Sequence, residues 1–281
     1  MKVGVVGLGL IGGSIAKAYK NAGHTVLGFD TDKSILGFAC LSNVLDGILD
    51  EEAMKSCNLI HIATYPKAAI EFLKQNAARF DRDCMVIDDC GTKRDVCKEG
   101  FALAEKYGFT FVGGHPMAGT KFSGYKYSRA SMFSGASMII VPPRFDDIEL
   151  YDHIKHMLAA MDLKRIVFTT AEDHDQMIAF TSQMAHVVSN AFVKSPSAQR
   201  HKGYSAGSFR DLTRVAWLNE NMWTELFIEN KEFLVDEIDI LIKNLEQYKT
   251  AIENDDADTL REILRQGRIA KEMCEKAEDT L

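Results

Sequence analysis

The N-terminal segment carries a glycine pattern of the kind that binds phosphate groups. Gly7, Gly9 and Gly12 form G-x-G-x-x-G directly after the apolar run Lys2–Val6. Between a strand and a helix, the first glycine permits a tight turn, and the second lets the backbone approach a pyrophosphate at the helix N-terminus. The third allows close packing of helix on strand. The sequence therefore predicts a dinucleotide site, with a plain glycine turn as the alternative.

Asp30 is the residue that would choose between cofactors. It ends the second apolar run, 18 positions after Gly12. An acid there accepts hydrogen bonds from ribose hydroxyls and repels a 2′-phosphate, and no arginine follows it directly. We therefore expect NAD rather than NADP, with a solvated or capping aspartate as the alternative. The predicted cofactor-binding residues are Gly7, Gly9, Leu10, Ile11, Gly12, Asp30 and Thr64.

Three further segments concentrate residues that can carry chemistry. Residues 88–93 read Asp-Asp-Cys-Gly-Thr-Lys, and residues 113–120 read Gly-Gly-His-Pro-Met-Ala-Gly-Thr. Each follows an apolar run, and doubly wound sheets bind their ligands where parallel strands end. Residues 207–214 read Gly-Ser-Phe-Arg-Asp-Leu-Thr-Arg, and Trp223 follows nine positions after Arg214.

Together these segments resemble the prephenate/arogenate dehydrogenase family of tyrosine biosynthesis, nearly from end to end. The helix from His174-Asp175 to His186 is part of the resemblance. It implies a Rossmann domain followed by a helical dimerisation domain, in the monofunctional form. The implied reaction is oxidative decarboxylation of a cyclohexadienol: hydride goes to the nicotinamide, the ring carboxylate leaves as CO₂, and prephenate yields 4-hydroxyphenylpyruvate.

The resemblance also assigns catalytic roles. His115 matches the family's catalytic histidine, and a neutral imidazole is suited to take the hydroxyl proton near pH 7. Thr92 stands where the family has a serine that hydrogen-bonds the same hydroxyl; capping the following helix is its alternative role. Arg214 matches the substrate-binding arginine, whose planar fork suits a carboxylate, with a surface ion pair as the alternative.

The same comparison assigns further substrate contacts. His186 and Trp223 match residues near the substrate, although Trp223 fits core packing equally well. For Lys93 we consider three roles: contact with a substrate carboxylate, orientation of its own loop, or a solvated side chain. His174 is expected to fix the start of its helix. Lys121 departs from several relatives, which carry a glutamate that helps gate the pocket, so that role is not transferred.

The elements that must position these residues follow from the apolar pattern. Nearly continuous apolar runs predict strands buried on both faces, and they alternate with helix-like stretches such as Ser14–Ala22 and Ala68–Asn76. After about Thr170 strand signals stop, and Ala171–Phe192 reads as one long helix. We therefore expect an NAD-binding Rossmann domain over 1–168 and a helical substrate and dimerisation domain over 169–281, with the pocket between them. The predicted strands are Lys2–Val6, Thr25–Phe29, Leu59–Ala63, Cys84–Asp88, Thr110–Val112, Met138–Val141 and Arg165–Phe168.

A second apolar pattern lies near the C-terminus. Six apolar residues between Leu234 and Ile252 recur at spacings of four and three, which predicts one stripe on a helix. Asp255 and Asp256 offer the start of another helix. The stripe fits packing within a subunit or across a homodimer.

Composition narrows the class of protein. The 281 residues include 33 basic and 40 acidic ones, a net charge of −7, so we expect no nucleic-acid partner. None of the six cysteines forms C-x-x-C, no metal motif is present, and no apolar run is long enough for a membrane span. No signal peptide precedes the first strand, so we expect a reduced, cytoplasmic enzyme with no membrane partner.

The leading hypothesis is an NAD-dependent prephenate dehydrogenase. Arogenate dehydrogenase is the nearest alternative, and no residue decides between the two. A pyrroline-carboxylate reductase or hydroxy-acid dehydrogenase would not explain the histidine and arginine segments together. A non-catalytic NAD-sensing protein is disfavoured by the presence of His115, Thr92 and Arg214.

Overall fold

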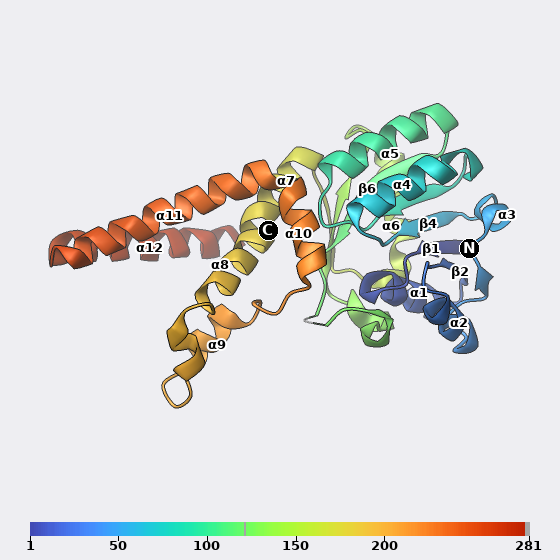
Figure 1. The fold of residues 1–281 in the computed structure, drawn as a ribbon. Coiled ribbons are helices and arrows are strands. Elements are labelled where there is room, and N and C mark those ends of the chain that lie inside the picture. Colours follow the sequence, from blue (N-terminus) through green and yellow to red (C-terminus); the bar gives the residue numbers. More distant parts are fainter. Residues whose placement is uncertain (121, 279–281) are drawn as a thin grey trace. The chain divides into compact units, whose positions relative to one another are not determined.

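A computed structural model describes residues 1–120 and 122–278. Lys121, where the sequence departs from its relatives, lies outside the described residues. The chain forms two compact units, Met1–Asn230 and Lys231–Leu281, which are described separately below (Figure 1).

The first unit is built on one eight-stranded sheet with the order β3-β2-β1-β4-β5-β6-β7-β8. All neighbouring strands run parallel except β6 and β7, which pair antiparallel. Strands β1, β2 and β8 have the predicted bounds, β6 continues four residues further than predicted, and the two-residue β3 was not predicted. The strands are β1 Lys2–Val6, β2 Thr25–Phe29, β3 Gly47–Ile48, β4 Leu59–Ile62, β5 Met85–Asp88, β6 Thr110–Pro116, β7 Ser137–Val141 and β8 Arg165–Phe168.

Helices cover both faces of this sheet, which explains why its strands are apolar on both sides. Ile15 and Tyr19 of α1 and Ile154 of α6 belong to one buried cluster. Leu73 of α4 and Val96 of α5 belong to the other. Figure 1 shows α4 and α5 on the opposite side of the strands from α1 and α2. The predicted doubly wound Rossmann sheet is confirmed. Its helices are α1 Leu10–Asn21, α2 Lys33–Leu41, α3 Glu51–Met54, α4 Pro66–Asn76, α5 Arg94–Tyr107 and α6 Ile148–Met157.

After β8 the described chain is helical. The predicted single helix over 171–192 is wrong in one respect, because a π-helical turn, η5 (Ala179–Met184), separates α7 (Ala171–Ile178) from α8 (Ala185–Phe192). Two further helices, α9 (Gly207–Thr213) and α10 (Glu220–Glu229), complete the first unit. Short 3₁₀ turns are η1 Ala77–Arg79, η2 Tyr125–Tyr127, η3 Ala130–Met132, η4 Ala159–Met161 and η6 Pro196–Arg200.

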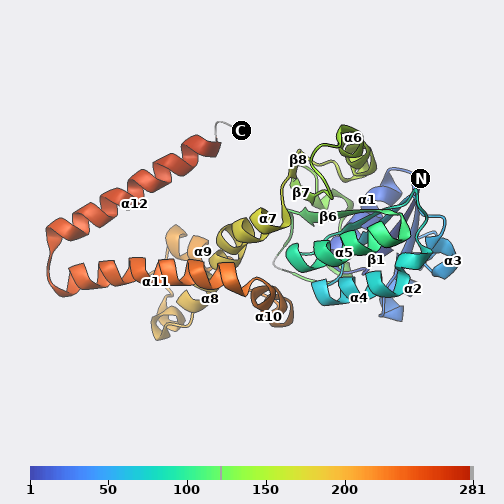
Figure 2. The same ribbon diagram turned by 90° about the horizontal axis from the view of Figure 1, so that it is seen from above.

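The second unit consists of two long helices that contact each other, α11 (Lys231–Glu253) and α12 (Ala257–Glu278) (Figure 2). The turn between them contains Asp255 in a left-handed conformation, with φ 52°. Asp256 accepts a hydrogen bond from the Thr259 amide at 3.0 Å, so the predicted start of the last helix is confirmed. No helix within the described residues is both long and apolar enough to cross a membrane.

Candidate active site

The loop between β1 and α1 has the shape that a pyrophosphate requires. Gly7 has φ +83°, and a Cβ on Gly12 would lie 1.8 Å from the Gly7 carbonyl oxygen, so neither position accepts a side chain. A Cβ on Gly9 would meet nothing within 4 Å, which leaves the helix N-terminus open. No side chain caps that end of α1. The open amide groups and the bare backbone therefore fit a dinucleotide phosphate.

Two other predicted cofactor residues border this loop. The Asp30 carboxylate accepts hydrogen bonds from the amides of Leu8 at 2.6 Å and Asp32 at 2.8 Å. Because a carboxylate has about four lone-pair sites, both oxygens can still accept ribose hydroxyls. Thr64 lies just after β4, the strand that pairs with β1. A Cβ on Gly7 would lie 2.7 Å from the methyl carbon of Thr64.

His115 is held by the sheet. It lies in β6 opposite Ile139 of β7, so backbone pairing on that side fixes its position. Its Nδ1 lies 2.9 Å from Nε2 of His174 in α7. The Nδ1 of His174 in turn lies 2.7 Å from Oδ1 of Asp175. The three side chains form a chain of hydrogen bonds that runs from the carboxyl end of β6 to α7.

Asp175 is an anchor for several groups. Its carboxylate accepts hydrogen bonds from the backbone amides of Lys93 at 2.7 Å and Arg94 at 3.0 Å, at the start of α5. Although burial opposes its charge, the hydrogen bond from His174 and those from the two amides hold the pKa of Asp175 below its ordinary value. Thr170, rather than His174, caps α7, by accepting the Asp173 amide at 3.0 Å. His174, near the start of α7, nevertheless ties that end of the helix to β6 through its hydrogen bond to His115, which agrees with its expected role.

Lys93 does not occupy the position expected of a substrate contact. Its side chain is fully buried, and its ammonium pairs with Asp88 and donates to the Gly114 carbonyl oxygen at 2.6 Å. Both the solvated alternative and the substrate contact are therefore wrong, because the buried ammonium is paired with Asp88 and does not reach solvent or a substrate. The third alternative, orientation of the loop, agrees with these contacts: Lys93 ties the loop after β5 to β6 one residue before His115.

Thr92 contacts a residue that sequence reasoning missed. Its hydroxyl donates to Oε2 of Glu229 at 2.8 Å, across 137 positions of sequence. Burial raises the pKa of Glu229 above its ordinary value, which the hydrogen bond from Thr92 partly opposes. The proposed alternative for Thr92, a helix cap, is wrong, because Asp175 satisfies the first amides of α5. The sequence contains no signal for Glu229, which lies on α10 in an amphipathic pattern.

The rings of His186 and Trp223, each predicted to lie near the substrate, contact each other. Their ring centroids lie 3.9 Å apart, and His186 Nδ1 bonds to the Ser182 carbonyl oxygen at 2.9 Å. Burial lowers the pKa of His186, and the nearby charge of Arg214 lowers it further. The hydrogen bond to the Ser182 carbonyl oxygen only partly opposes these two effects. A cavity of about 280 Å³ is lined by both rings and by Asn190, Lys194 and Glu220, among others. Arg214 is exposed, and no described carboxylate forms an ion pair with it, so the ion-pair alternative is wrong.

The π-helical turn explains how one helix serves both histidines. His174 and His186 are twelve residues apart, and in a regular α-helix they would point about 120° apart. A π turn closes i to i+5 and takes up one extra residue, which reduces that angle to about 20°. The wide turn therefore brings the two histidines to one side of the helix.

Models of two protein domains match the chain. The nucleotide-binding domain of prephenate dehydrogenase matches residues 15–167, and the prephenate dehydrogenase dimerization domain matches residues 170–266. The chain belongs to the prephenate dehydrogenase family.

Individual relatives agree with this family membership. The prephenate dehydrogenase of Bacillus subtilis is 29% identical over 91% of this chain and 71% of its own length. The cyclohexadienyl dehydrogenase of Zymomonas mobilis is 28% identical over 96% of this chain and 94% of its own. A crystal structure of prephenate dehydrogenase from A. aeolicus with hydroxyphenyl propionate and NAD+ covers 98% of both chains, with TM-score 0.83 and 26% identity. Arogenate dehydrogenase from Synechocystis covers 97% of this chain and 99% of its own, with TM-score 0.79 and 25% identity.

Within this family fold, the predicted residues lie in three places. The glycine loop, Asp30 and Thr64 lie along the edge formed by β1, β2 and β4. His115 and Thr92 lie at the ends of the adjacent strands β6 and β5. The helices that follow the sheet carry the three residues predicted to bind the substrate, His186 on α8, Arg214 at the end of α9 and Trp223 on α10. All three places belong to the first compact unit, Met1–Asn230.

Proposed function

We propose that this protein is an NAD-dependent prephenate dehydrogenase, which converts prephenate to 4-hydroxyphenylpyruvate and CO₂. The observation that carries the proposal, beyond family membership, is the placement of His115. Nδ1 of His115 lies 2.9 Å from Nε2 of His174, so this hydrogen bond occupies Nδ1 and leaves Nε2 available at the carboxyl end of β6. Oxidation of an alcohol needs such a base, because the hydroxyl proton must leave as hydride departs.

The glycine loop, Leu10, Ile11, Asp30 and Thr64 would hold NAD. The pyrophosphate fits the open backbone at Gly9, and the Asp30 carboxylate fits the ribose hydroxyls. When bound, NAD supplies the acceptor for the hydride. Asp30 favours NAD over NADP, because a 2′-phosphate would approach a fixed negative charge.

His115 and Thr92 would act on the substrate hydroxyl. Burial, together with the neighbouring His174 and Lys93, lowers the pKa of His115 well below its ordinary value, so the imidazole is neutral at pH 7. Thr92 then orients the hydroxyl, since its own hydrogen can turn from Glu229 toward the substrate oxygen.

Arg214 and His186 would bind the substrate carboxylate remote from the reacting carbon. From His174 to His186 the helix advances about 17 Å, because the π turn takes up one of the twelve residues. That length accommodates His115, a six-membered ring with a three-carbon side chain, and a hydrogen bond of about 2.8 Å at each end. Trp223 packs on His186 and limits the rotation of its ring.

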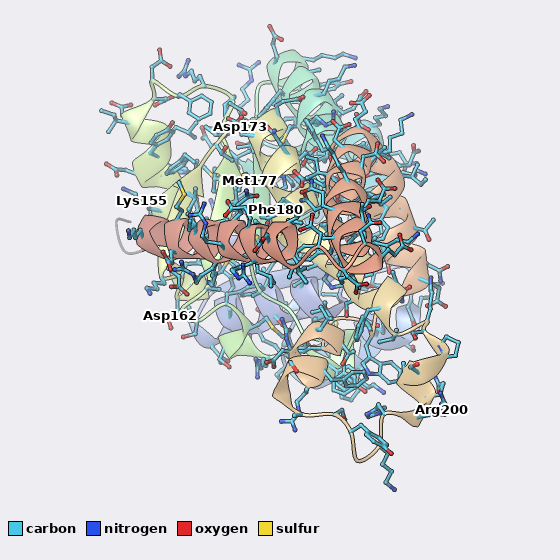
Figure 3. All side chains as sticks on the ribbon, turned by 90° about the vertical axis from the view of Figure 1, so that its left-hand side faces the viewer. Lys155, Asp162, Asp173, Met177, Phe180 and Arg200 are labelled. Carbon is cyan, nitrogen blue, oxygen red and sulfur yellow. The ribbon has the colours of Figure 1, made fainter. Side chains whose placement is uncertain are left out.

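The local charge favours an anionic substrate although the whole chain is acidic. Between positions 190 and 219 there are five Lys or Arg residues and one acidic residue, against a net charge of −7 overall. Arg200 ends η6, the 3₁₀ turn between α8 and α9 (Figure 3). Such an excess of positive charge attracts anions over about 8–10 Å at physiological salt, because dissolved ions screen charges that are further apart.

Two further properties accompany this proposal. We also propose a boundary at 168/169 between the nucleotide-binding and helical domains. It is supported by the two family models, which end at residue 167 and begin at residue 170. A homodimer through the helical part is supported by the dimerization model and by exposed apolar side chains. Met177 and Phe180, 57% and 59% exposed, lie along α7 and η5 (Figure 3), and Leu245 and Ile252 of α11 are 56% and 60% exposed.

The substrate assay tests the proposal. Purified protein would receive prephenate or arogenate with NAD or NADP, and reduced cofactor would be followed by absorbance. We expect turnover with prephenate and NAD, and a higher kcat/KM with NAD than with NADP. A higher kcat/KM with arogenate would identify the protein as an arogenate dehydrogenase, and no turnover with either substrate would refute the proposal.

A further inference from the structure

We propose that His174 and Asp175 set the tautomer of His115 and that His174 receives the proton His115 takes from the substrate. This inference rests on the proposed dehydrogenase reaction. It adds two positioning residues that lie behind the catalytic histidine and do not touch the substrate.

The tautomer follows from the direction of the hydrogen bonds. Asp175 is ionised, so its Oδ1 can only accept, and Nδ1 of His174 must carry the hydrogen at 2.7 Å. A neutral His174 then has a bare Nε2, which accepts from Nδ1–H of His115 at 2.9 Å. A neutral His115 therefore has a bare Nε2, the atom left to face the substrate.

Asp175 is held too firmly to reverse this direction. The amides of Lys93 and Arg94 donate to its two oxygens, and Arg94 Nε donates to Oδ2 at 3.3 Å. The backbone carbonyl oxygen of Asp175 accepts from Asn230 at 2.8 Å. His174 and Asp175 are 2% and 1% exposed, so water does not compete for these bonds.

The proton balance is a transfer in two steps. The substrate O–H bond breaks, and its proton forms a bond to Nε2 of His115. The Nδ1–H bond of His115 then breaks, and that proton forms a bond to Nε2 of His174. The result is a neutral His115 and a His174 imidazolium against the Asp175 carboxylate. Each new N–H bond uses a lone pair of the accepting nitrogen, each broken bond leaves its electron pair on the atom that loses the proton, and neither step changes an oxidation state.

The surrounding charges favour the second histidine as the resting place of the proton. His115 faces His174 and the Lys93 ammonium, which both oppose a positive charge on it. His174 also faces Lys93, but it has the carboxylates of Asp175 and Asp88 nearby. Burial lowers the pKa of both rings, and only for His174 do carboxylates oppose that shift.

The first test is made on the resting protein, without substrate or cofactor. Histidine labelled with ¹⁵N distinguishes Nδ1–H from Nε2–H by NMR, and His115→Asn and His174→Gln assign the signals. We expect wild-type His115 and His174 both to carry hydrogen on Nδ1. Hydrogen on Nε2 of His115 would overturn the proposal, whereas failure of the dehydrogenase proposal would leave this spectrum unchanged.

The second test separates tautomer from proton transfer. His174→Gln keeps an acceptor near the position of Nε2 but cannot carry the proton, whereas His174→Phe keeps neither property. We expect the Gln variant to retain the His115 tautomer with kcat lowered about 10²-fold, and the Phe variant to lose both, with kcat lowered about 10³–10⁴-fold. His153→Gln, on the exposed face of α6, is the matched control and should match wild type. An unchanged kcat and pH profile for His174→Gln would overturn the transfer step.

Discussion

The π-helical turn predicts that the helix from His174 to His186 tolerates a deletion far better than an insertion. Thr181 lies in this turn with an exposed side chain, whose hydroxyl bonds only to the Met177 carbonyl oxygen at 2.7 Å among the described contacts. Deleting Thr181 removes the one residue that the wide turn takes up. The segment can then close as a regular α-helix, and the two histidines keep their common side.

An alanine inserted after Thr181 has the opposite effect. It rotates the helix beyond it by about 100°, which displaces the His186 Cα by about 3.5 Å sideways and about 1.5 Å along the axis. The ring contact with Trp223, now 3.9 Å between centroids, is lost. A hydrogen bond to a charged group is worth about 1.5–3 kcal/mol, so KM for prephenate should rise about 10- to 150-fold.

Steady-state kinetics with saturating NAD would compare wild type, the deletion and the insertion, and thermal unfolding would confirm that each is folded. We expect the deletion to stay within about threefold of wild type in KM, which is less than 1 kcal/mol. The reasoning is refuted if deletion and insertion raise KM equally, or if the insertion leaves KM unchanged.

Three other predictions follow from the site. Arg214→Gln should raise KM about 10- to 150-fold with little change in kcat, and an unchanged KM would remove Arg214 from the carboxylate site. Lys93→Met leaves Asp88 buried without its cation, so urea unfolding should show a loss of about 3–5 kcal/mol; a loss below about 1 kcal/mol would contradict the buried pair. Because neutral His115 is the active form and its pKa is lowered from 6.5, kcat/KM should stay level from pH 7 to 6.5 and fall only below that range. A decline centred above pH 6.5 would contradict this assignment.

The sequence predicted the elements whose residues carry a local signal. Strands β1, β2 and β8 were predicted to the residue, because each is a largely apolar run with a clear boundary at either end. The two-residue β3 has too few residues for any periodicity. The π turn was missed for a related reason, since one extra residue changes the helical phase without changing composition.

The candidate site was predictable only where chemistry and spacing coincide. His115, Arg214 and the glycine loop stand in recognisable segments, and their assignment as site residues stays a prediction. Glu229 was not predictable, because its contact with Thr92 spans 137 positions and exists only after α10 packs beside the sheet. Lys93 was misjudged as a substrate contact or a solvated side chain, because a lysine is rarely buried, although Asp88 at the end of β5, five positions earlier, was the available signal for a buried pair.

The central claim is that His115 is the base that takes the substrate proton. The most direct measurement compares kcat of wild type and His115→Asn at pH 7 with prephenate and NAD, with His153→Asn as the control and prephenate binding measured separately. We predict turnover by wild type and the control, and a loss of about 10²–10⁴-fold in kcat for His115→Asn while prephenate still binds. A kcat for His115→Asn within a few-fold of wild type would contradict the account.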